Sequence, residues 1–355
     1  MRCVAFSPDS HYLCSVGDTN DGFVYVWAIH LKTGSARLHS SNRCTANVRD
    51  ISWIGNSIVT VGTRHVKVWR LPQAANASPS KARFNVESDA AGSPTSPAPK
   101  TLGGRNCLLG PLLDAVFTCV AAISDFQAIV CTDRGDVCLL DDSTRAQQLV
   151  KVAHVHFSVA CITIDNTAKC AWIGGADGTT EALPLDILSR HPPPEPFEAE
   201  APLGNITGSH VKPGCVAMGI IDSYLITLDS ARAIKFDHIE HLAAGDEAGA
   251  VAKRITAHRS AILGVSALHQ PNDYTADFLT WSAEGSVIFW ALDGSCKGNL
   301  HVELDSTLRD HEGWGNELRV VRACAQDGTL LSGDKCGVLR CVFIIFHELY
   351  YELTY

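Results

Sequence analysis

The sequence contains neither a long apolar stretch nor a run of basic residues. Its longest apolar run, Val338 to Phe346, includes Arg340 and is far shorter than the roughly 20 residues of a membrane-spanning helix. The first residues, Met1 to Asp9, lack the apolar core of a signal peptide. The net charge is −9, which argues against binding to nucleic acids or to anionic membranes. We therefore expect a cytoplasmic protein that contacts neither.

Sequence motifs of common catalytic and metal sites are also missing. There is no G-x-S-x-G nucleophile elbow, no G-x-x-x-x-G-K phosphate loop and no H-E-x-x-H pair. None of the 14 cysteines forms a C-x-x-C pair, and most lie in apolar, strand-like runs, as is typical of buried free thiols. We therefore expect no enzymatic activity, no cofactor and no metal site.

What the sequence does contain is a repeat. Seven segments share an apolar strand, a polar turn, a second apolar strand, a turn with Gly or Asp, and a third, alternating strand. The clearest copies cover residues 3–27, 48–71 and 262–290, and weaker copies cover residues 117–141, 159–185, 216–239 and 319–343. Without the long insertion after Leu71, their spacing is about 40 to 55 residues, which is close to the period of a WD40 blade.

The residue pattern within each repeat favours a β-propeller. Alternation such as Val24-x-Val26 or Val66-x-Val68 produces strands whose two faces both need a packing partner. Radial stacking of small sheets buries these faces against one another, and no segment has sustained helical periodicity. We predict an all-β WD40 propeller of about seven four-stranded units. A β-sandwich is the alternative fold.

Tryptophans that end three of the strands are expected to pack between blades. In WD40 blades the indole N–H of such a tryptophan joins a network of Ser or Thr, His and Asp. Trp27, Trp69 and Trp290 occupy this position, and His258 lies upstream of Trp290 where the network histidine is expected. The turn that should supply the aspartate carries Glu284 instead, so this network is expected to be incomplete.

Two insertions and an unusual tail interrupt the repeats. Residues 73–104 are rich in Ser, Pro and Ala and are predicted to be disordered, and residues 189–213 form a Pro-rich loop. Residues 344–355 are an atypical apolar tail. We therefore assign residues 1–72 to the first two blades and residues 105–343 to the remaining blades.

The first insertion also contains three Ser-Pro pairs. Ser78, Ser93 and Ser96 each precede a proline, as proline-directed kinases require. Such pairs are also common in low-complexity loops, so these serines are candidate phosphorylation sites only.

Several segments resemble the mitogen-activated protein kinase-binding protein 1 family of WD-repeat scaffolds. The residues that carry the resemblance are Asn47 to Leu71, Gly104 to Gly110, Val116 to Ala121, Phe278 to Glu284 and Leu331 to Arg340. Members of that family have two tandem propellers and a long C-terminal region that binds kinases and other partners. The resemblance implies binding to signalling kinases or cytoskeletal proteins, in MAP-kinase signalling or at the mitotic spindle.

The resemblance leaves two arrangements of the repeats open. Compared with that family, the chain begins after the first blade or two of one propeller and ends within the first blade of the next. On this alignment, six blades and the start of a second propeller would form an open ring that self-associates. The rival arrangement is a closed ring of seven blades.

Function follows from the same features. A propeller without catalytic motifs is expected to act as a scaffold for protein–protein interactions. The alternative is a substrate receptor of a ubiquitin ligase. Such receptors often end a blade in W-D-x-R, whereas the strand endings here are Trp27-Ala28-Ile29-His30 and Trp69-Arg70-Leu71-Pro72.

Overall fold

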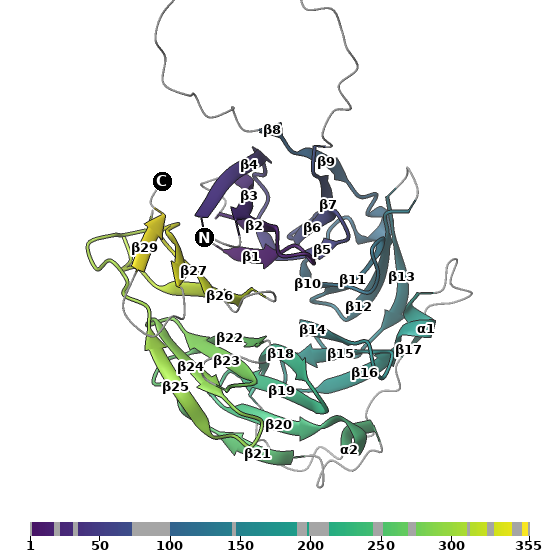
Figure 1. Ribbon diagram of the computed structural model, residues 1–355. Helices are drawn as coiled ribbons and strands as arrows, with labels where there is room; N and C mark the ends of the chain where they lie inside the picture. The colour runs from purple at the N-terminus through teal and green to yellow at the C-terminus, as the bar shows by residue number, and fades with distance from the viewer. Residues whose placement is uncertain are drawn as a thin grey trace, which may run out of the picture.

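Seven β-sheets surround a central axis in the computed structural model, and each sheet extends outward like a propeller blade (Figure 1). This count refers to the described part of the chain: residues 2–17, 22–30, 35–72, 100–143, 147–189, 197–198, 213–243, 251–268, 275–310, 313–324, 330–342 and 350–353. Helical turns are short there: η1 (Gly110–Leu112), α1 (Leu185–Leu188) and α2 (Ile239–Ala243). The predicted WD40-type β-propeller is therefore confirmed.

The strands follow the chain from blade to blade. Blade 1 contains β1 (Cys3–Phe6), β2 (Tyr12–Val16), β3 (Phe23–His30), β4 (Ser35–Arg43) and β8 (Lys100–Thr101), and blade 2 contains β5 (Val48–Ile54), β6 (Ser57–Gly62), β7 (His65–Arg70) and β9 (Gly103–Asn106). Blade 3 contains β10 (Phe117–Ala122), β11 (Gln127–Thr132), β12 (Asp136–Asp141), β13 (Gln148–His154) and β17 (Phe197–Glu198), and blade 4 contains β14 (Val159–Asp165), β15 (Cys170–Gly175) and β16 (Thr180–Pro184).

The last three blades have four strands each. Blade 5 contains β18 (Cys215–Ile221), β19 (Tyr224–Asp229), β20 (Ile234–His238) and β21 (Val251–Ile255), and blade 6 contains β22 (Ile262–Ala267), β23 (Phe278–Ser282), β24 (Ser286–Trp290) and β25 (Cys296–His301). Blade 7 contains β26 (Leu318–Ala323), β27 (Leu330–Asp334), β28 (Leu339–Val342) and β29 (Tyr350–Leu353).

The second strand of a blade shows why the sheets stack. Every residue of β6, β23 and β27 is buried, because each of these strands lies between two neighbouring sheets. The outer strand β25 alternates between exposed and half-buried residues instead. A strand that is buried on both faces reads as a continuous apolar run, and this is the pattern that the repeats show.

The ring closes between the last blade and the first. The first strand of every blade lies nearest the axis and contacts the first strand of each neighbouring blade, and β26 contacts β1 in the same way (Figure 1). Val4 and Leu13 of blade 1 share one buried apolar cluster with Val320 and Leu330 of blade 7. The seventh unit therefore belongs to the same ring, and the alternative of six blades plus the start of a second propeller is wrong.

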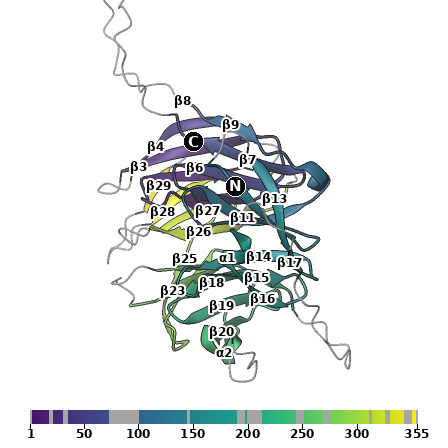
Figure 2. The same ribbon diagram turned by 90° about the vertical axis from the view of Figure 1, so that its right-hand side faces the viewer.

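Three boundaries from the sequence need correction. The segment 73–104 was predicted to be disordered, but residues 100–101 form β8 and residues 103–104 begin β9 (Figures 1 and 2). Strand β9 pairs with β7 and completes blade 2, so the insertion interrupts this blade and does not follow it. Likewise, Phe197–Glu198 of the Pro-rich loop pairs with β13, and Tyr350–Leu353 of the apolar tail pairs with β28.

These short strands gave no signal in the sequence. All four residues of β9 are exposed, so the strand has no apolar face that alternation could reveal. Its anchor is Leu102, which is fully buried between the strands that it joins. The Leu102 backbone is fixed as well, since its N–H donates to the Ser41 oxygen over 3.0 Å and its carbonyl accepts from Asn42 Nδ2 over 2.6 Å.

Candidate binding cavity on the propeller axis

A β-bulge recurs near the start of the inner strands. In β5, Val48 pairs with Gly62 and Asp50 pairs with Val61, so Arg49 has no partner across the ladder. The same register shift occurs in β10, β14, β18, β22 and β26, and the residues that it leaves out are Thr118, Ala160, Val216, Leu263 and Arg319. A bulge redirects the side chain of its extra residue. Six blades therefore present one side chain each at the same level of the axis.

Arg2 occupies the equivalent position in blade 1. Cys3 pairs with Val16, and the Arg2 N–H donates to the Val16 carbonyl over 2.8 Å. Cys3 thus corresponds to Asp50 of blade 2, and Arg2 corresponds to Arg49. The ring of equivalent positions is complete with seven members, and three of them, from the consecutive blades 7, 1 and 2, are arginines.

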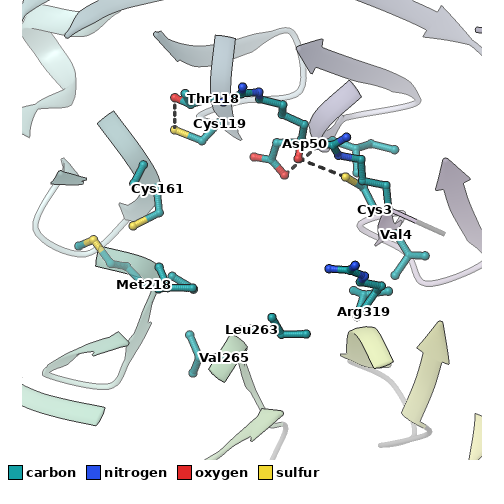
Figure 3. A pocket seen from close by; sticks show the side chains of 18 of the residues that line it. Cys3, Val4, Asp50, Thr118, Cys119, Cys161, Met218, Leu263, Val265 and Arg319 are labelled. Carbon is teal, nitrogen blue, oxygen red and sulfur yellow. Dashed lines mark hydrogen bonds between the residues drawn. The ribbon is translucent and has the colours of Figure 1, made fainter. Parts of the chain in front are cut away.

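These seven residues, with the residues that follow them, line a cavity of about 300 Å³ on the axis (Figure 3). We call Arg2, Arg49 and Arg319 the arginine arc, and Ala160, Val216 and Leu263 the apolar arc. Figure 3 shows Arg319 and Cys3 across the cavity from Cys161 and Met218. One wall of the cavity is therefore cationic, and the facing wall is apolar and rich in sulfur.

The arginines keep donors available for a ligand. Arg2 Nη1 donates to Asn47 Oδ1 over 2.6 Å, and Arg319 Nη2 lies 3.1 Å from Glu317 Oε2. The Arg49 guanidinium makes neither a hydrogen bond nor an ion pair with another described residue. Because each guanidinium carries five N–H groups, most donors of the arginine arc face solvent or the cavity.

A fourth arginine lies in the same wall. Arg322 is 5.5 Å from the centre of the Trp281 ring, in a cation–π arrangement. Burial lowers the pKa of Arg322, while the nearby Asp50 carboxylate raises it. A guanidinium keeps its charge under such a shift, so Arg322 adds positive potential to the cationic wall.

The only carboxylate that lines the cavity, among the described residues, is Asp50. Asp50 Oδ1 accepts from the Ile51 N–H over 2.8 Å, and Oδ2 accepts from the Val120 N–H over 2.9 Å. Burial raises the pKa of Asp50 to about 6, although both hydrogen bonds and Arg322 oppose the shift. Asp50 thus connects blade 2 to blade 3 rather than serving as a free base.

The thiols of Cys3 and Cys161 in the cavity wall are protonated at neutral pH. Burial, with a smaller contribution from Asp50, raises the pKa of Cys3 to about 12. The pKa of Cys161 is raised as well, first by its hydrogen bond with Cys215 and then by burial. Among the described residues, no group of three or more His, Cys, Asp and Glu side chains is placed to hold a metal ion.

The residues predicted to form the blade 6 network lie between sheets, away from the cavity. Trp290 Nε1 donates to Thr280 Oγ1 over 2.9 Å, and His258 Nε2 lies 2.8 Å from the same oxygen. Burial lowers the pKa of His258 to about 4, so its ring is neutral. His258 Nδ1 is buried and has no hydrogen-bond partner in the described structure.

Blades 1 and 2 use related arrangements. Trp27 Nε1 donates to Ser15 Oγ over 2.9 Å. Trp69 Nε1 donates to Thr60 Oγ1 over 2.9 Å, and the His65 Nε2 atom lies 2.8 Å from that oxygen. The sequence did not suggest His65, because it comes from the start of β7 and not from the loop that precedes the blade.

The candidate phosphorylation sites Ser78, Ser93 and Ser96 lie outside the described residues.

The arginine arc was also missed by the sequence analysis. Each arginine lies near the start of a first strand, where a charged residue reads as an ordinary surface residue. Alignment of the repeats on the residue after the bulge would have placed all three in one column.

Within the described residues, no helix is long and apolar enough to cross a membrane.

Comparisons with solved structures agree with the fold. The chain is similar to BBS1N, solved in complex with ARL6DN, with a TM-score of 0.60, 12% identity, and coverage of 96% of this chain and 91% of that one. It is similar to the WD40 β-propeller domain of Doa1, with a TM-score of 0.59, 12% identity, and coverage of 95% and 90%. It is also similar to the computationally designed protein Ika8, with a TM-score of 0.53, 15% identity, and coverage of 97% of this chain and 83% of that one.

Comparison with protein-family models gives no match, and neither does comparison with curated proteins. The similarity to solved structures establishes the WD40 propeller fold, and a propeller of this kind is consistent with binding to other proteins. The resemblance to the mitogen-activated protein kinase-binding protein 1 family finds no support in these comparisons.

Proposed function

We propose that this protein is a non-catalytic interaction scaffold that docks a partner protein over the mouth of the axial cavity. The observation that carries the proposal is the ring of seven equivalent positions, which directs side chains from all blades toward one opening. A rigid ring that presents variable side chains at one end is suited to recognition.

The chemistry of the cavity supports binding more than catalysis. Both oxygens of Asp50 accept backbone hydrogen bonds, and the Cys3 thiol has a pKa of about 12. The Asp50 carboxylate is therefore engaged by the backbone of two blades, and the Cys3 thiol is protonated at neutral pH and is a poor nucleophile. The structural neighbour BBS1N was solved in complex with a protein partner, ARL6DN, which supports a similar kind of role here.

The partner class follows from the resemblance in the sequence. We propose signalling kinases or cytoskeletal proteins as partners, in MAP-kinase signalling or mitotic spindle organisation. This role requires a cytoplasmic location, at the cytoskeleton or the spindle.

Affinity purification of the tagged full chain, followed by binding of each purified candidate measured by calorimetry, tests this function. Direct binding that Arg49→Glu abolishes is the expected result. The matched control is Arg43→Glu, because Arg43 is exposed on the outer strand β4 of blade 1. Absence of any direct partner would contradict the scaffold role, and recovery of ubiquitin-ligase subunits would favour the alternative of a substrate receptor.

A further inference from the structure

We propose that the arginine arc binds an anionic side chain of an extended partner peptide, while the apolar arc receives a neighbouring apolar side chain of the same peptide. The anionic group is a carboxylate or a phosphate, since both present oxygens to guanidinium groups. This inference rests on the proposed function, because it specifies what the mouth of the cavity recognises.

Charge is the first argument. The whole chain has a net charge of −9, yet arginines at positions 2, 49 and 319 meet at one opening with Arg322 beside them. The carboxylates that oppose them are Asp50, whose oxygens already accept backbone N–H groups, and Glu317, which pairs with Arg319. Positive charge therefore remains in excess at the mouth, where it attracts an anion.

Geometry is the second argument. The three arginines come from consecutive blades and start at the same level, and all three line the same side of the cavity. A guanidinium donates two parallel N–H groups, which match the oxygens of a carboxylate or a phosphate. Arg2 and Arg319 are held by Asn47 and Glu317, and Arg49 has no such contact, so it is the arginine best able to turn toward a ligand.

Size and polarity select a peptide as the occupant. A cavity of about 300 Å³ is at the lower end of the range for ligand pockets and accepts one or two side chains. Val216 is 37% exposed at the opposite side, and Leu263 lies half-buried beside it. A ligand that was only an anion would leave these two side chains uncovered, whereas a peptide with an acidic residue next to an apolar one satisfies both arcs.

The test uses the full chain and four fluorescent peptides of sequence Gly-Ala-X-Leu-Ala-Gly. The variable residue X is phosphoserine, glutamate, serine or lysine, and binding is measured by fluorescence anisotropy. We expect the phosphoserine and glutamate peptides to bind and the serine and lysine peptides to fail. Whichever of the first two binds more tightly identifies the natural anion. Binding should weaken as the salt concentration rises, because the contacts are charged.

Variants connect binding to the arc. Arg49→Ala and Arg319→Ala should each weaken binding of the tighter peptide by about tenfold, as loss of a charged hydrogen bond does. Leu263→Ser should weaken it less, and Arg43→Ala should leave it unchanged. Arg49 and Arg43 are both exposed, so neither substitution removes core packing, and circular dichroism checks that each variant is folded.

Three results would overturn the inference. The first is equal binding of all four peptides, and the second is binding that survives both arginine substitutions. The third is competition by inorganic phosphate at the same concentration as the phosphoserine peptide, which would show a site for a free anion. If a purified partner protein still binds the chain in any of these cases, the scaffold role stands and only the assignment of the arginine arc fails.

Discussion

Asp50 in blade 2 accepts a hydrogen bond from the backbone N–H of Val120 in blade 3, over 2.9 Å, at the edge of the axial cavity. The carboxylate therefore joins two blades while it lies in the cavity wall with the charged side chains of Arg49 and Arg322 and the neutral thiol of Cys3. Its ionisation links the stability of the ring to pH.

The first prediction concerns this linkage. The pKa of Asp50 is about 6 in the folded protein and 3.8 without the fold, so the folded state holds the extra proton between these values. The tighter binding of this proton by the folded protein stabilises the fold fully below pH 3.8, and this stabilisation is lost as the pH rises through 6. Asn cannot ionise, so the free energy of unfolding of Asp50→Asn, measured in urea, should rise by about 2 kcal/mol relative to that of the wild type as the pH goes from 4.5 to 7. A difference that does not depend on pH would contradict this.

The second prediction concerns Thr280, which holds both Trp290 and His258 in blade 6. Thr280→Val leaves two buried ring nitrogens without their partner and should lower the free energy of unfolding by about 2–3 kcal/mol. Thr101→Val is the control, because Thr101 is exposed on β8. Chemical denaturation of both variants checks this, and equal stabilities would show that the network contributes nothing.

The third prediction uses the buried Nδ1 atom of His258, which has no partner among the described residues. An aspartate in the turn that holds Glu284 would supply the acceptor that WD40 blades use at this point. Glu284→Asp should raise the free energy of unfolding by about 1 kcal/mol, and Glu284→Ala should not. Equal melting temperatures for the two variants would mean that the turn does not reach His258.

The fourth prediction concerns closure between blades 7 and 1. Leu330 is fully buried in the cluster that contains Val4 and Leu13. Leu330→Ala should lower the free energy of unfolding, measured by chemical denaturation, by about 2–5 kcal/mol. Leu108→Ala should leave it unchanged, because Leu108 is 64% exposed.

Light scattering after size-exclusion chromatography completes this test. The wild type should elute as a monomer with a single cooperative unfolding transition, since the sheet faces of the first and last blades cover each other. Self-association of the wild type would instead indicate that this seam opens in solution.

The sequence was most informative where burial acts on every second residue or on a whole strand. The blades around Val61 and Trp290 were identified because inner strands must bury both faces. The strands β8 and β9 were missed, because two and four exposed residues carry no such pattern. Strand β17 was missed because a strand of two residues is too short to show one. Their positions depend on neighbours such as Leu102, whose burial depends on strands far away in the chain.

The candidate site was harder to predict than the fold. Arg2, Arg49 and Arg319 are separated by most of the chain, and only ring closure brings the first and last of them together. A register shift at the same place in each blade then turns them toward the axis. The pattern of a single sequence shows neither the closure of the ring nor the register shift. The tryptophans that pack between blades were predictable, because they belong to a local motif.

The recurring bulge has a consequence for how such a protein can diverge. A residue outside the ladder has no cross-strand neighbour to match, so its replacement leaves the hydrogen bonds of the blade intact. Arg49 and Leu263 show how far two such positions can differ within one chain. Six blades of this chain contain such a position, and each can accept a different side chain while the ladder around it stays paired. Specificity can thus change by single substitutions around the opening while the ring keeps its shape.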